Sequence, residues 1–262
     1  MKLGLEGRTA VVTGASRGIG LAVARALREE GAQVAAGALG GSAELSALAA
    51  EGGVVEVHGD LTTSAGCQAL VDTAVERFGG VDVLVNNVGG VHPRTEGFGA
   101  VTDEDWQWAL EVNLLSAVRA TRAALPHLVR AAPSAVVTIC SVNATLPDPG
   151  VIDYSAAKAA LRSFCKSLSK EVGPAGVRVN TVSPGPVETA LWLGAGGVAD
   201  TLGRAQGVDP AAVRAAAVEG TATRRFTRPE EVAQVVLLLA SESAGNVTGA
   251  DVLIDGGMVT TV

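Results

Sequence analysis

The sequence predicts an α/β fold built on a doubly wound, mostly parallel sheet that is flanked by helices. Apolar runs of strand length alternate with helical patterns seven times along the 262 residues, which is typical of parallel strands joined by crossover helices. Polar or glycine-rich segments follow several of these runs, at the strand ends where open parallel sheets bind ligands. Hydrophobic residues make up 48% of the chain and charged residues 18%, which excludes a disordered protein. We find no internal repeat and no linker, so we expect one domain over residues 1–262.

The first predicted strand, Thr9–Thr13, leads directly into a glycine-rich turn and a helical pattern that continues to Glu30. The turn reads Gly14-Ala-Ser-Arg-Gly18-Ile-Gly20. Glycine permits a tight turn and a close approach of the backbone, and a helix N-terminus offers free N–H groups and the positive end of the helix dipole. Strand, glycine turn and helix together predict a phosphate-binding site.

The second predicted strand, Gln33–Ala38, carries information about the cofactor. In dinucleotide-binding folds an acidic residue about twenty positions after the glycines binds the ribose hydroxyls and selects NAD. Ala38 and Leu39 occupy this place, so the carboxylate is missing. Arg17, inside the glycine turn, can instead meet a 2′-phosphate, which favours NADP(H). The alternative is that Arg17 is a solvated surface side chain and that NAD(H) is used.

The next two predicted strands, Val54–Val57 and Val81–Val85, each end at polar residues. Asp60 and Leu61 follow the first, where Asp60 can also serve simply to order the turn before the next helix. Asn86-Asn87-Val88-Gly89 follows the second. The glycine-rich loop from Gly90 to Gly99 contains His92 and Arg94, which either contact substrate or belong to a solvated loop.

A long helical pattern, Trp106–Arg130, follows a helix start at Thr102 that has a capping side chain and acidic residues in its first turn. Asn113 lies among apolar neighbours within this pattern. A buried amide needs hydrogen-bond partners, so Asn113 has a local purpose, which is either structural or functional.

The segment from Ser141 to Lys158 carries the candidate chemistry. Tyr154 and Lys158 are four residues apart in a segment with a helical apolar stripe, so both side chains lie on one face of the helix. A lysine beside a tyrosine favours the phenolate; reaching neutral pH from a free phenol near pH ~10 requires a shift of about three units, or about 4 kcal/mol. Ser141 ends a predicted buried strand, Ala135–Cys140, and its hydroxyl can hold a substrate oxygen together with that of Tyr154.

The last part of the chain completes the pattern. A sixth strand, Val177–Val182, leads into Ser183-Pro-Gly-Pro-Val-Glu-Thr189, and Ala250–Ile254 is the final strand. The region 190–223 is irregular, with two weak helical segments, and Trp192 in it either forms a wall facing the substrate or packs in the protein interior. Thr227-Arg-Pro-Glu230 predicts a capping box at the start of a helix that runs to about Ser241.

Three of these motifs together resemble the classical short-chain dehydrogenase/reductase family, and its 3-oxoacyl-ACP reductase-like branch in particular. They are the Gly-x-x-x-Gly-x-Gly turn, the Asn86–Gly89 element, and Ser141 followed by Tyr-x-x-x-Lys. The resemblance extends from Gly7 to Gly257. It implies a single-domain Rossmann fold with a seven-stranded sheet and a substrate lid around residues 187–225.

The resemblance also implies a set of site residues. Catalysis would use Asn113, Ser141, Tyr154 and Lys158. Cofactor contacts would come from Gly14, Ser16, Arg17, Gly18, Ile19, Gly20, Asp60, Leu61, Asn86, Asn87, Gly89, Tyr154, Lys158, Pro184, Gly185, Val187 and Thr189.

Individual roles follow from the same resemblance. Asp60 and Leu61 would contact adenine, and the Val187 backbone, helped by the Thr189 hydroxyl, would hold the nicotinamide carboxamide. Lys158, aided by the positive charge of the oxidised nicotinamide, would lower the pKa of Tyr154, and it would also hold the nicotinamide ribose. The Asn113 amide would bend its helix and anchor a water molecule that links the lysine to solvent.

The implied reaction is the transfer of hydride between nicotinamide and a carbonyl or secondary alcohol. Tyr154 gives the proton in reduction and removes it in oxidation, and Ser141 stabilises the developing oxyanion. An NADP(H)-dependent ketoreductase is favoured. The alternatives are an NAD-dependent alcohol, polyol or hydroxysteroid dehydrogenase and a non-catalytic nucleotide-binding module.

Composition narrows the partners. The net charge is −7 without a cluster of Lys and Arg, which argues against binding to nucleic acid or to an acidic membrane surface. Three cysteines and three histidines show no metal-ligand spacing, and no apolar run reaches membrane-spanning length. We therefore expect a cytoplasmic protein with an uncharged or largely apolar small-molecule substrate and no metal, and the family resemblance implies a homotetramer or homodimer.

Overall fold

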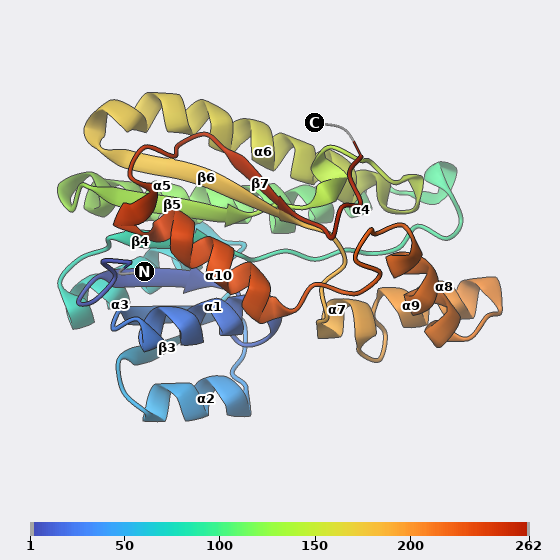
Figure 1. Cartoon of the computed structure of the whole chain (residues 1–262), viewed down its shortest axis with the longest axis horizontal. Helices are drawn as coiled ribbons and strands as arrows, with labels where there is room; N and C mark the ends of the chain where they lie inside the picture. Colours follow the sequence, from blue (N-terminus) through green and yellow to red (C-terminus); the bar gives the residue numbers. More distant parts are fainter. Residues whose placement is uncertain (1–2, 261–262) are drawn as a thin grey trace.

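A computed structural model describes residues 3–260 and contains a seven-stranded sheet in the order β3-β2-β1-β4-β5-β6-β7 (Figure 1). Every neighbouring pair of strands is parallel, so the predicted doubly wound sheet is confirmed. The strands are β1 (Thr9–Thr13), β2 (Gln33–Ala38), β3 (Val54–His58), β4 (Val83–Asn86), β5 (Ser134–Ile139), β6 (Val177–Pro184) and β7 (Asp251–Ile254).

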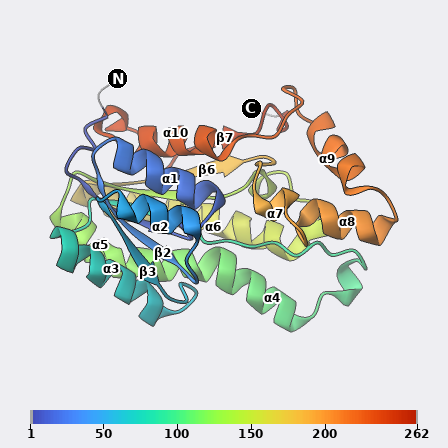
Figure 2. The same cartoon turned by 90° about the horizontal axis from the view of Figure 1, so that it is seen from below.

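Helices cover both faces of the sheet. They are α1 (Gly18–Glu29), α2 (Ala43–Ala50), α3 (Ser64–Phe78), α4 (Asp103–Leu110), α5 (Ser116–Arg130), α6 (Ile152–Val172), α7 (Ala190–Leu193), α8 (Val198–Gln206), α9 (Pro210–Glu219) and α10 (Pro229–Ala240). Figure 2 shows α1 and α10 on one side of the sheet and α3 and α5 on the other. Helices α4, α7, α8 and α9 lie beyond the end toward which the strands point.

The apolar strands form because both of their faces are buried. All five residues of β1 are buried, and alternate residues belong to different cores: Val12 packs with α1 and α10, whereas Val11 packs with α3, α5 and α6. Strands buried on both faces appear in the sequence as nearly continuous apolar runs rather than as alternating ones. This explains why the bounds of β1 and β2 match the predicted runs.

The sheet reverses its direction of growth between β1 and β4. Strands β2 and β3 extend the sheet from one edge of β1, and the chain then returns to place β4 against the other edge. The connections after β1 and β4 therefore diverge at their carboxyl ends, which is where ligands bind in such sheets.

The long helix expected over Trp106–Arg130 is divided. A turn of π-helix, Glu111–Leu115, separates α4 from α5. Helix α4 begins after its cap Thr102, as expected. The Thr102 side chain accepts the Asp105 N–H, and the Asp105 carboxylate accepts the Thr102 N–H. The π-turn places Asn113 inward, fully buried. Such turns are frequent at functional sites.

Two other expectations require correction. The capping box of α10 is shifted by one residue: Arg228 is the cap, and Glu231 accepts its backbone N–H at 2.8 Å. Thr227 is instead engaged by its backbone, which pairs with the segment around Val187. The irregular region 190–223 contains three helices, α7 to α9, instead of two.

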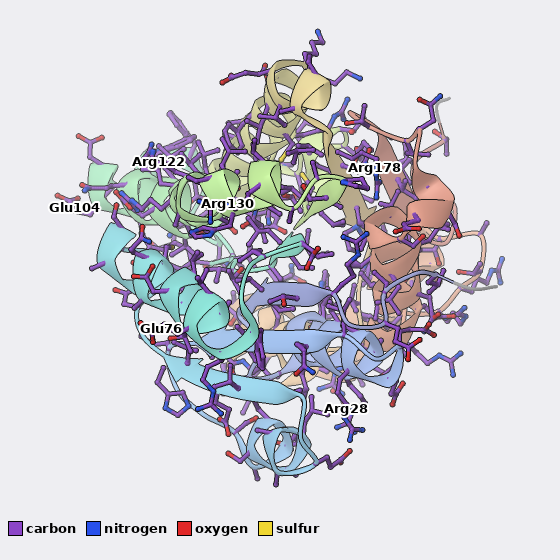
Figure 3. The ribbon with its side chains drawn as sticks, turned by 90° about the vertical axis from the view of Figure 1, so that its left-hand side faces the viewer. Arg28, Glu76, Glu104, Arg122, Arg130 and Arg178 are labelled. Atoms are coloured by element: carbon purple, nitrogen blue, oxygen red, sulfur yellow. The ribbon has the colours of Figure 1, made fainter. Side chains whose placement is uncertain are left out.

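Arg178 on β6 caps the C-terminal end of α10 (Figure 3). Its guanidinium donates to the carbonyls of Leu239 at 2.7 Å and Ser241 at 3.0 Å. The last carbonyls of a helix lack partners within the helix, and a cation near them also interacts favourably with the helix dipole. Arg178 therefore fixes α10 to the sheet.

We expect Arg8→Met to lower the free energy of unfolding without changing the site. Arg8 precedes β1 and donates to Asp82 at 2.7 Å and Glu242 at 2.8 Å. Losing these partly exposed, charged hydrogen bonds should cost about 1–2 kcal/mol, measurable by urea unfolding. The site lies at the opposite ends of the strands, so a parallel loss of cofactor binding would contradict this prediction.

Candidate active site

The glycine turn after β1 forms a backbone cradle at the N-terminus of α1. Gly14 and Gly18 have φ angles of 66° and 57°, in the left-handed region that favours glycine. A Cβ on Gly20 would lie 2.3 Å from the Gly14 carbonyl oxygen, so no larger residue fits there. The start of α1 has no side-chain cap and no acidic residue in its first turn, which leaves its N–H groups available to an anion. The cradle fits the pyrophosphate of a dinucleotide.

A hydrogen-bonded seam joins this cradle to the end of β4. The Thr13 hydroxyl oxygen accepts the N–H groups of Asn87 at 2.9 Å and Val88 at 3.2 Å. The Asn87 side chain donates to the carbonyls of Thr13 and Gly14, both at 3.0 Å. Asn87 thus fixes the shape of the glycine turn. Thr13 was not among the residues that the sequence singled out, because as part of a strand it gives no separate signal.

Asn86 points away from the crevice. Its side-chain amide donates to Thr121 at 3.0 Å and Thr138 at 3.3 Å, and its residue is 3% exposed. Asn86 therefore ties β4 to β5 and α5, and only its main chain is left for contact with a cofactor.

The residues expected at the adenine differ in exposure. Asp60 is exposed and accepts both the backbone N–H of Thr62 at 2.9 Å and its hydroxyl at 2.6 Å. These two bonds hold the pKa of the Asp60 carboxyl below its usual value, and the bond from the Thr62 hydroxyl has the larger effect. The geometry agrees with the turn-ordering alternative for Asp60. The Leu61 side chain is buried in the core, which leaves its main chain for the predicted adenine contact.

The residue that follows β2 is Leu39 and not a carboxylate. Leu39 is 79% exposed there. Arg17 is exposed and forms no ion pair within residues 3–260. Ser42 caps α2 and donates its hydroxyl to the Ser16 carbonyl at 2.6 Å, so it holds α2 against the glycine turn. Ser42 was not predicted as a site residue, although a serine before a helical pattern is a recognisable capping signal.

The side chains of Tyr154 and Ser141 are brought together. Tyr154 lies in the first turn of α6, half-buried, and is hydrogen-bonded to the Ser141 side chain at the end of β5. The Ser141 hydroxyl also donates to the Asn143 side-chain oxygen and accepts the Asn143 N–H, both at 3.2 Å. Asn143, which the sequence did not single out, therefore orients the serine.

Lys158 is buried between the ends of β4 and β5. Its Nζ donates to the Ile139 carbonyl at 3.0 Å and lies 5.7 Å from the centre of the Tyr154 ring. A Cβ on Gly89 would lie 3.4 Å from this Nζ and 3.1 Å from the Asn113 side-chain oxygen. Gly89 therefore provides the space in which Lys158 and Asn113 approach each other.

In the protein without cofactor, the surroundings of Tyr154 disfavour its ionisation. Burial raises the pKa of Tyr154 to about 12, a change that the Ser141 hydrogen bond only partly opposes. Burial also lowers the pKa of Lys158, because the charged ammonium loses hydration. Without cofactor the protein's own residues therefore favour the neutral phenol, and the expectation that Lys158 and the charge of the oxidised nicotinamide together lower the tyrosine pKa stays a prediction.

Asn113 is saturated by hydrogen bonds within the protein. Its side-chain oxygen accepts the Gly90 N–H at 3.1 Å, and its amide donates to the carbonyls of Gly90 at 2.8 Å and Ala109 at 3.1 Å. These bonds fix the loop after Gly89 against the π-turn. They also account for the interruption of the helix.

The segment after β6 lies against the glycine turn. A Cβ on Gly18 would be 3.2 Å from the Thr189 methyl carbon, and a Cβ on Gly185 would be 3.0 Å from the Asp255 Cα. Pro184 and Val187 are buried, and the Val187 carbonyl accepts the Thr189 N–H at 2.8 Å. The predicted segments from both halves of the chain thus meet across the crevice.

Side chains of the loop from Gly90 to Gly99 form contacts with the neighbouring helices. The His92 and Trp108 rings stack with their centres 3.8 Å apart. Arg94 forms ion pairs with Asp105 and with Asp153, the residue before Tyr154. Arg94 is therefore not a solvated side chain, and its contact with substrate stays a prediction. Trp192 packs edge-on against Phe226, with ring centres 5.8 Å apart, as in its packing alternative.

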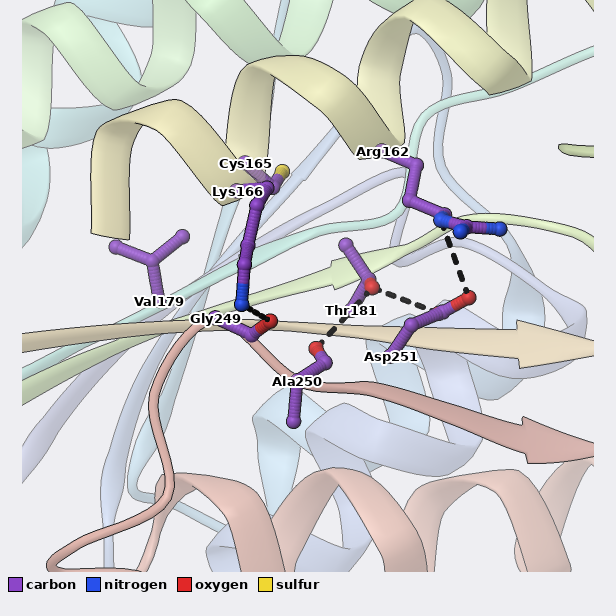
Figure 4. A pocket seen from close by; sticks show the side chains of 8 residues that line it. All are labelled: Arg162, Cys165, Lys166, Val179, Thr181, Gly249, Ala250 and Asp251. Atoms are coloured by element: carbon purple, nitrogen blue, oxygen red, sulfur yellow. Dashed lines mark hydrogen bonds and ion pairs between the residues drawn. The ribbon is translucent and has the colours of Figure 1, made fainter. Parts of the chain in front are cut away.

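A separate hollow of about 270 Å³ lies between α6, β6 and β7 (Figure 4). Its polar groups are already engaged: Lys166 donates to the Gly249 carbonyl at 2.7 Å, and Asp251 faces Arg162 at 3.7 Å and accepts from Thr181 at 2.7 Å. Ser141 and Tyr154 do not line this hollow. Its bonds tie α6 to the edge strand.

Two negative findings hold for residues 3–260. None of the helices in this range is long and apolar enough to cross a membrane. Nor do three His, Cys, Asp or Glu side chains in the same range gather into a potential metal site.

Comparisons with known proteins agree with this arrangement. The family model described as enoyl-(acyl carrier protein) reductase matches residues 14–259. A 3-oxoacyl-[acyl-carrier-protein] reductase of Vibrio cholerae is 34% identical and covers 98% of this chain and 99% of its own. Glucose 1-dehydrogenase 2 of Bacillus subtilis is 34% identical, with coverages of 97% and 95%. The crystal structure of L-sorbose reductase from Gluconobacter frateurii with NADPH and L-sorbose superimposes with a TM-score of 0.91, at 33% identity and 100% coverage of both chains.

We expect the protein without cofactor to show no tyrosinate absorbance up to about pH 10. Tyr154 is the only tyrosine in the chain, so ultraviolet difference absorbance reports this residue alone. Burial disfavours the charged phenolate, raises the pKa and keeps the proton in place as the pH rises. The urea-unfolded chain is the control and should titrate near pH ~10. A midpoint in the folded protein below that of the unfolded chain would contradict the prediction.

Proposed function

The chain belongs to the short-chain dehydrogenase/reductase family, and from this membership we propose that it is an NADP(H)-dependent ketoreductase that works through Ser141, Tyr154 and Lys158. As a member of the family it is an oxidoreductase that interconverts carbonyl and alcohol groups with a nicotinamide cofactor. The observation that carries the proposal is the contact of Tyr154 with Ser141 beside buried Lys158, at the strand ends that the glycine cradle also faces.

The residues around the crevice suit a dinucleotide. The Gly14–Gly20 cradle and the start of α1 would hold the pyrophosphate, and the buried segment Pro184–Thr189 would hold the nicotinamide. When bound, the cofactor supplies or accepts the hydride. Lys158 would reach the nicotinamide ribose from its place beside Gly89.

Tyr154 acts as the acid when a carbonyl is reduced. Reduction leaves negative charge on the substrate oxygen, which must receive a proton. The buried phenol keeps its proton at neutral pH, since burial raises its pKa to about 12. This protonated state supports the reductive direction. Work in the oxidative direction would require the positive charge of the oxidised nicotinamide to lower that pKa.

Ser141 stabilises the charge that develops on the substrate oxygen. Its hydroxyl is held from two sides, by the Tyr154 and Asn143 side chains, so little reorganisation is needed as charge appears. Asn113 contributes indirectly, because its bonds to Gly90 fix the loop beside Lys158. Helices α7 to α9, which lie beyond the strand ends, are proposed as the substrate lid.

The preference for NADP(H) is supported by charge at the adenosine end. Arg17 is exposed and has no ion-pair partner among residues 3–260, and β2 ends at Leu39 rather than at an acidic residue. A 2′-phosphate would gain a cation there, whereas a 2′-hydroxyl would find no carboxylate. An NAD-dependent alcohol dehydrogenase is the second candidate, and cofactor kinetics separate the two.

Two further features bear on partners. Residues 190–193 in the proposed lid are the apolar sequence Ala-Leu-Trp-Leu, which supports an uncharged or largely apolar small molecule as substrate. Ala156 and Ala159 are exposed on α6, so a second copy of the chain can approach this helix closely, in keeping with the proposed dimer or tetramer.

Tyr154→Phe should reduce carbonyl-dependent NADPH oxidation about 10²- to 10⁴-fold, because the proton donor is removed. The panel would contain L-sorbose, cyclohexanone, a quinone and a β-ketoacyl thioester. The NADPH dissociation constant, measured by fluorescence, should change little and serves as the control for folding. A variant that turns over at close to the parental rate would refute the proposed mechanism.

Arg17→Ala should raise the KM for NADPH about 10- to 100-fold and leave the KM for NADH nearly unchanged, because a charged hydrogen bond to phosphate is lost. Arg25 is also exposed on α1 and provides the matched control, Arg25→Ala, which should alter neither KM. A parental preference for NADH would favour the second candidate.

A further inference from the structure

Arg94 connects three parts of the site through one guanidinium. Its Nη1 donates to Asp105 at 2.8 Å, and its Nε and Nη2 donate to one oxygen of Asp153, the first of these at 3.2 Å. Its backbone N–H donates to the Gly150 carbonyl at 2.7 Å. Asp105 belongs to the first turn of α4, and Asp153 to the first turn of α6. The loop after β4 is thereby tied to both helices.

Asp153 is a carboxylate that depends on this arginine. Its side chain is only 2% exposed, and its second oxygen is buried with no hydrogen-bond partner in the part of the chain that the structure describes. The Arg94 side chain is itself only 12% exposed. A buried carboxylate without its cation is strongly unfavourable, so loss of Arg94 would force the first turn of α6 to move or admit water.

Within residues 3–260 the first turn of α6 has no other ion pair, and its one further side-chain bond is the weaker one in which the Ser155 hydroxyl accepts the Asp148 N–H at 3.3 Å. The cap residue, Val151, has an apolar side chain that forms no capping hydrogen bond, and the preceding turn, Pro149–Val151, is capped separately by Asp148. Tyr154 is the next residue after Asp153. The position of its ring relative to Ser141 therefore depends on how firmly Asp153 is held.

The same loop carries the partner of Asn113. Gly90 is bonded to Asn113 through both its N–H and its carbonyl, and Arg94 lies four residues further on. One loop thus joins the π-turn at one end to the Tyr154 turn at the other.

We propose that Arg94 and Asp153 are positioning residues that hold the first turn of α6, and with it Tyr154, at the distance from Ser141 that proton transfer requires. The inference rests on the proposed role of Tyr154 in catalysis. Neither residue touches the reacting atoms. Their action is through the place of the tyrosine, where a misplacement of about 1 Å can cost about 100-fold in rate.

The test compares Arg94→Met with a matched control, Arg8→Met. Arg8 also bridges two carboxylates from different segments, Asp82 and Glu242, but at the other ends of the strands. For Arg94→Met we expect kcat with the panel substrate to fall about 10- to 100-fold, with the NADPH dissociation constant unchanged within about twofold. Arg8→Met should lose stability and keep kcat. An unchanged kcat in Arg94→Met would overturn the inference.

The double variant Arg94→Met/Asp153→Asn separates positioning from stability. Removal of the buried charge should return the urea midpoint toward that of the parent, because no carboxylate is left without a cation. The ion pair between positions 94 and 153 is still absent, so kcat should stay low. Recovery of kcat together with stability would show a merely structural role and overturn the inference. If Arg94→Met does not fold, the kcat of the double variant is the test. A low kcat supports the inference, and a parental kcat overturns it.

A readout without substrate keeps this inference distinct from the proposed function. Loosening the first turn of α6 admits water to Tyr154, and since burial is the main cause of its raised pKa, the tyrosinate midpoint should fall from about 12 toward the value of the unfolded chain. Arg8→Met should retain the parental midpoint. An identical midpoint in Arg94→Met and the parent would overturn the inference even if no carbonyl compound is reduced. Failure of Tyr154→Phe to lose activity would instead overturn the proposed function.

Discussion

The seam between β1 and β4 is the constraint on which the site depends. At this point the sheet reverses its growth, and two connections leave neighbouring strands in opposite directions. The hydroxyl of Thr13 and the amide of Asn87 bond the two strand ends to each other, and the glycine turn takes its shape from those bonds. Gly20 lies so close to the Gly14 carbonyl oxygen that no side chain would fit at this position. The phosphate cradle is therefore a consequence of how the sheet is wound.

Around this seam the protein buries polar groups and satisfies most of them internally. Lys158 and Asn113 meet beside Gly89, and each is bonded to main-chain carbonyls. The same burial that holds Tyr154 in place makes its phenol a weaker acid. Burial thus sets both the position of Tyr154 and its protonated state, and that state is the one the proposed reduction uses.

Strand bounds and motif residues could be predicted because their signals are local. β1 and β2 are apolar runs buried on both faces, and the Tyr154–Lys158 spacing follows from helical geometry. The ion pairs of Arg94 could not, since its partners are 11 and 59 residues away and only the folded loop brings them together. The raised pKa of Tyr154 in the cofactor-free protein could not be predicted for a similar reason: adjacency to Lys158 is visible in the sequence, whereas the extent of desolvation is a property of the packed site. The resemblance assigned an adenine contact to Leu61, but it did not show that the side chain lies in the core.

The short bridge between Val187 and Thr227 brings both ends of the α7–α9 segment to one point, and Arg178 holds the helix that follows. A chain excursion whose ends are already joined can change in length and sequence without altering the closure of the sheet. The α7–α9 segment can therefore vary while the sheet to which it is joined stays the same. If this segment is the substrate lid, as proposed, its substrate preference could diverge during evolution while the rest of the sheet is inherited intact, which accords with relatives as different as a sugar reductase and an acyl-carrier-protein reductase.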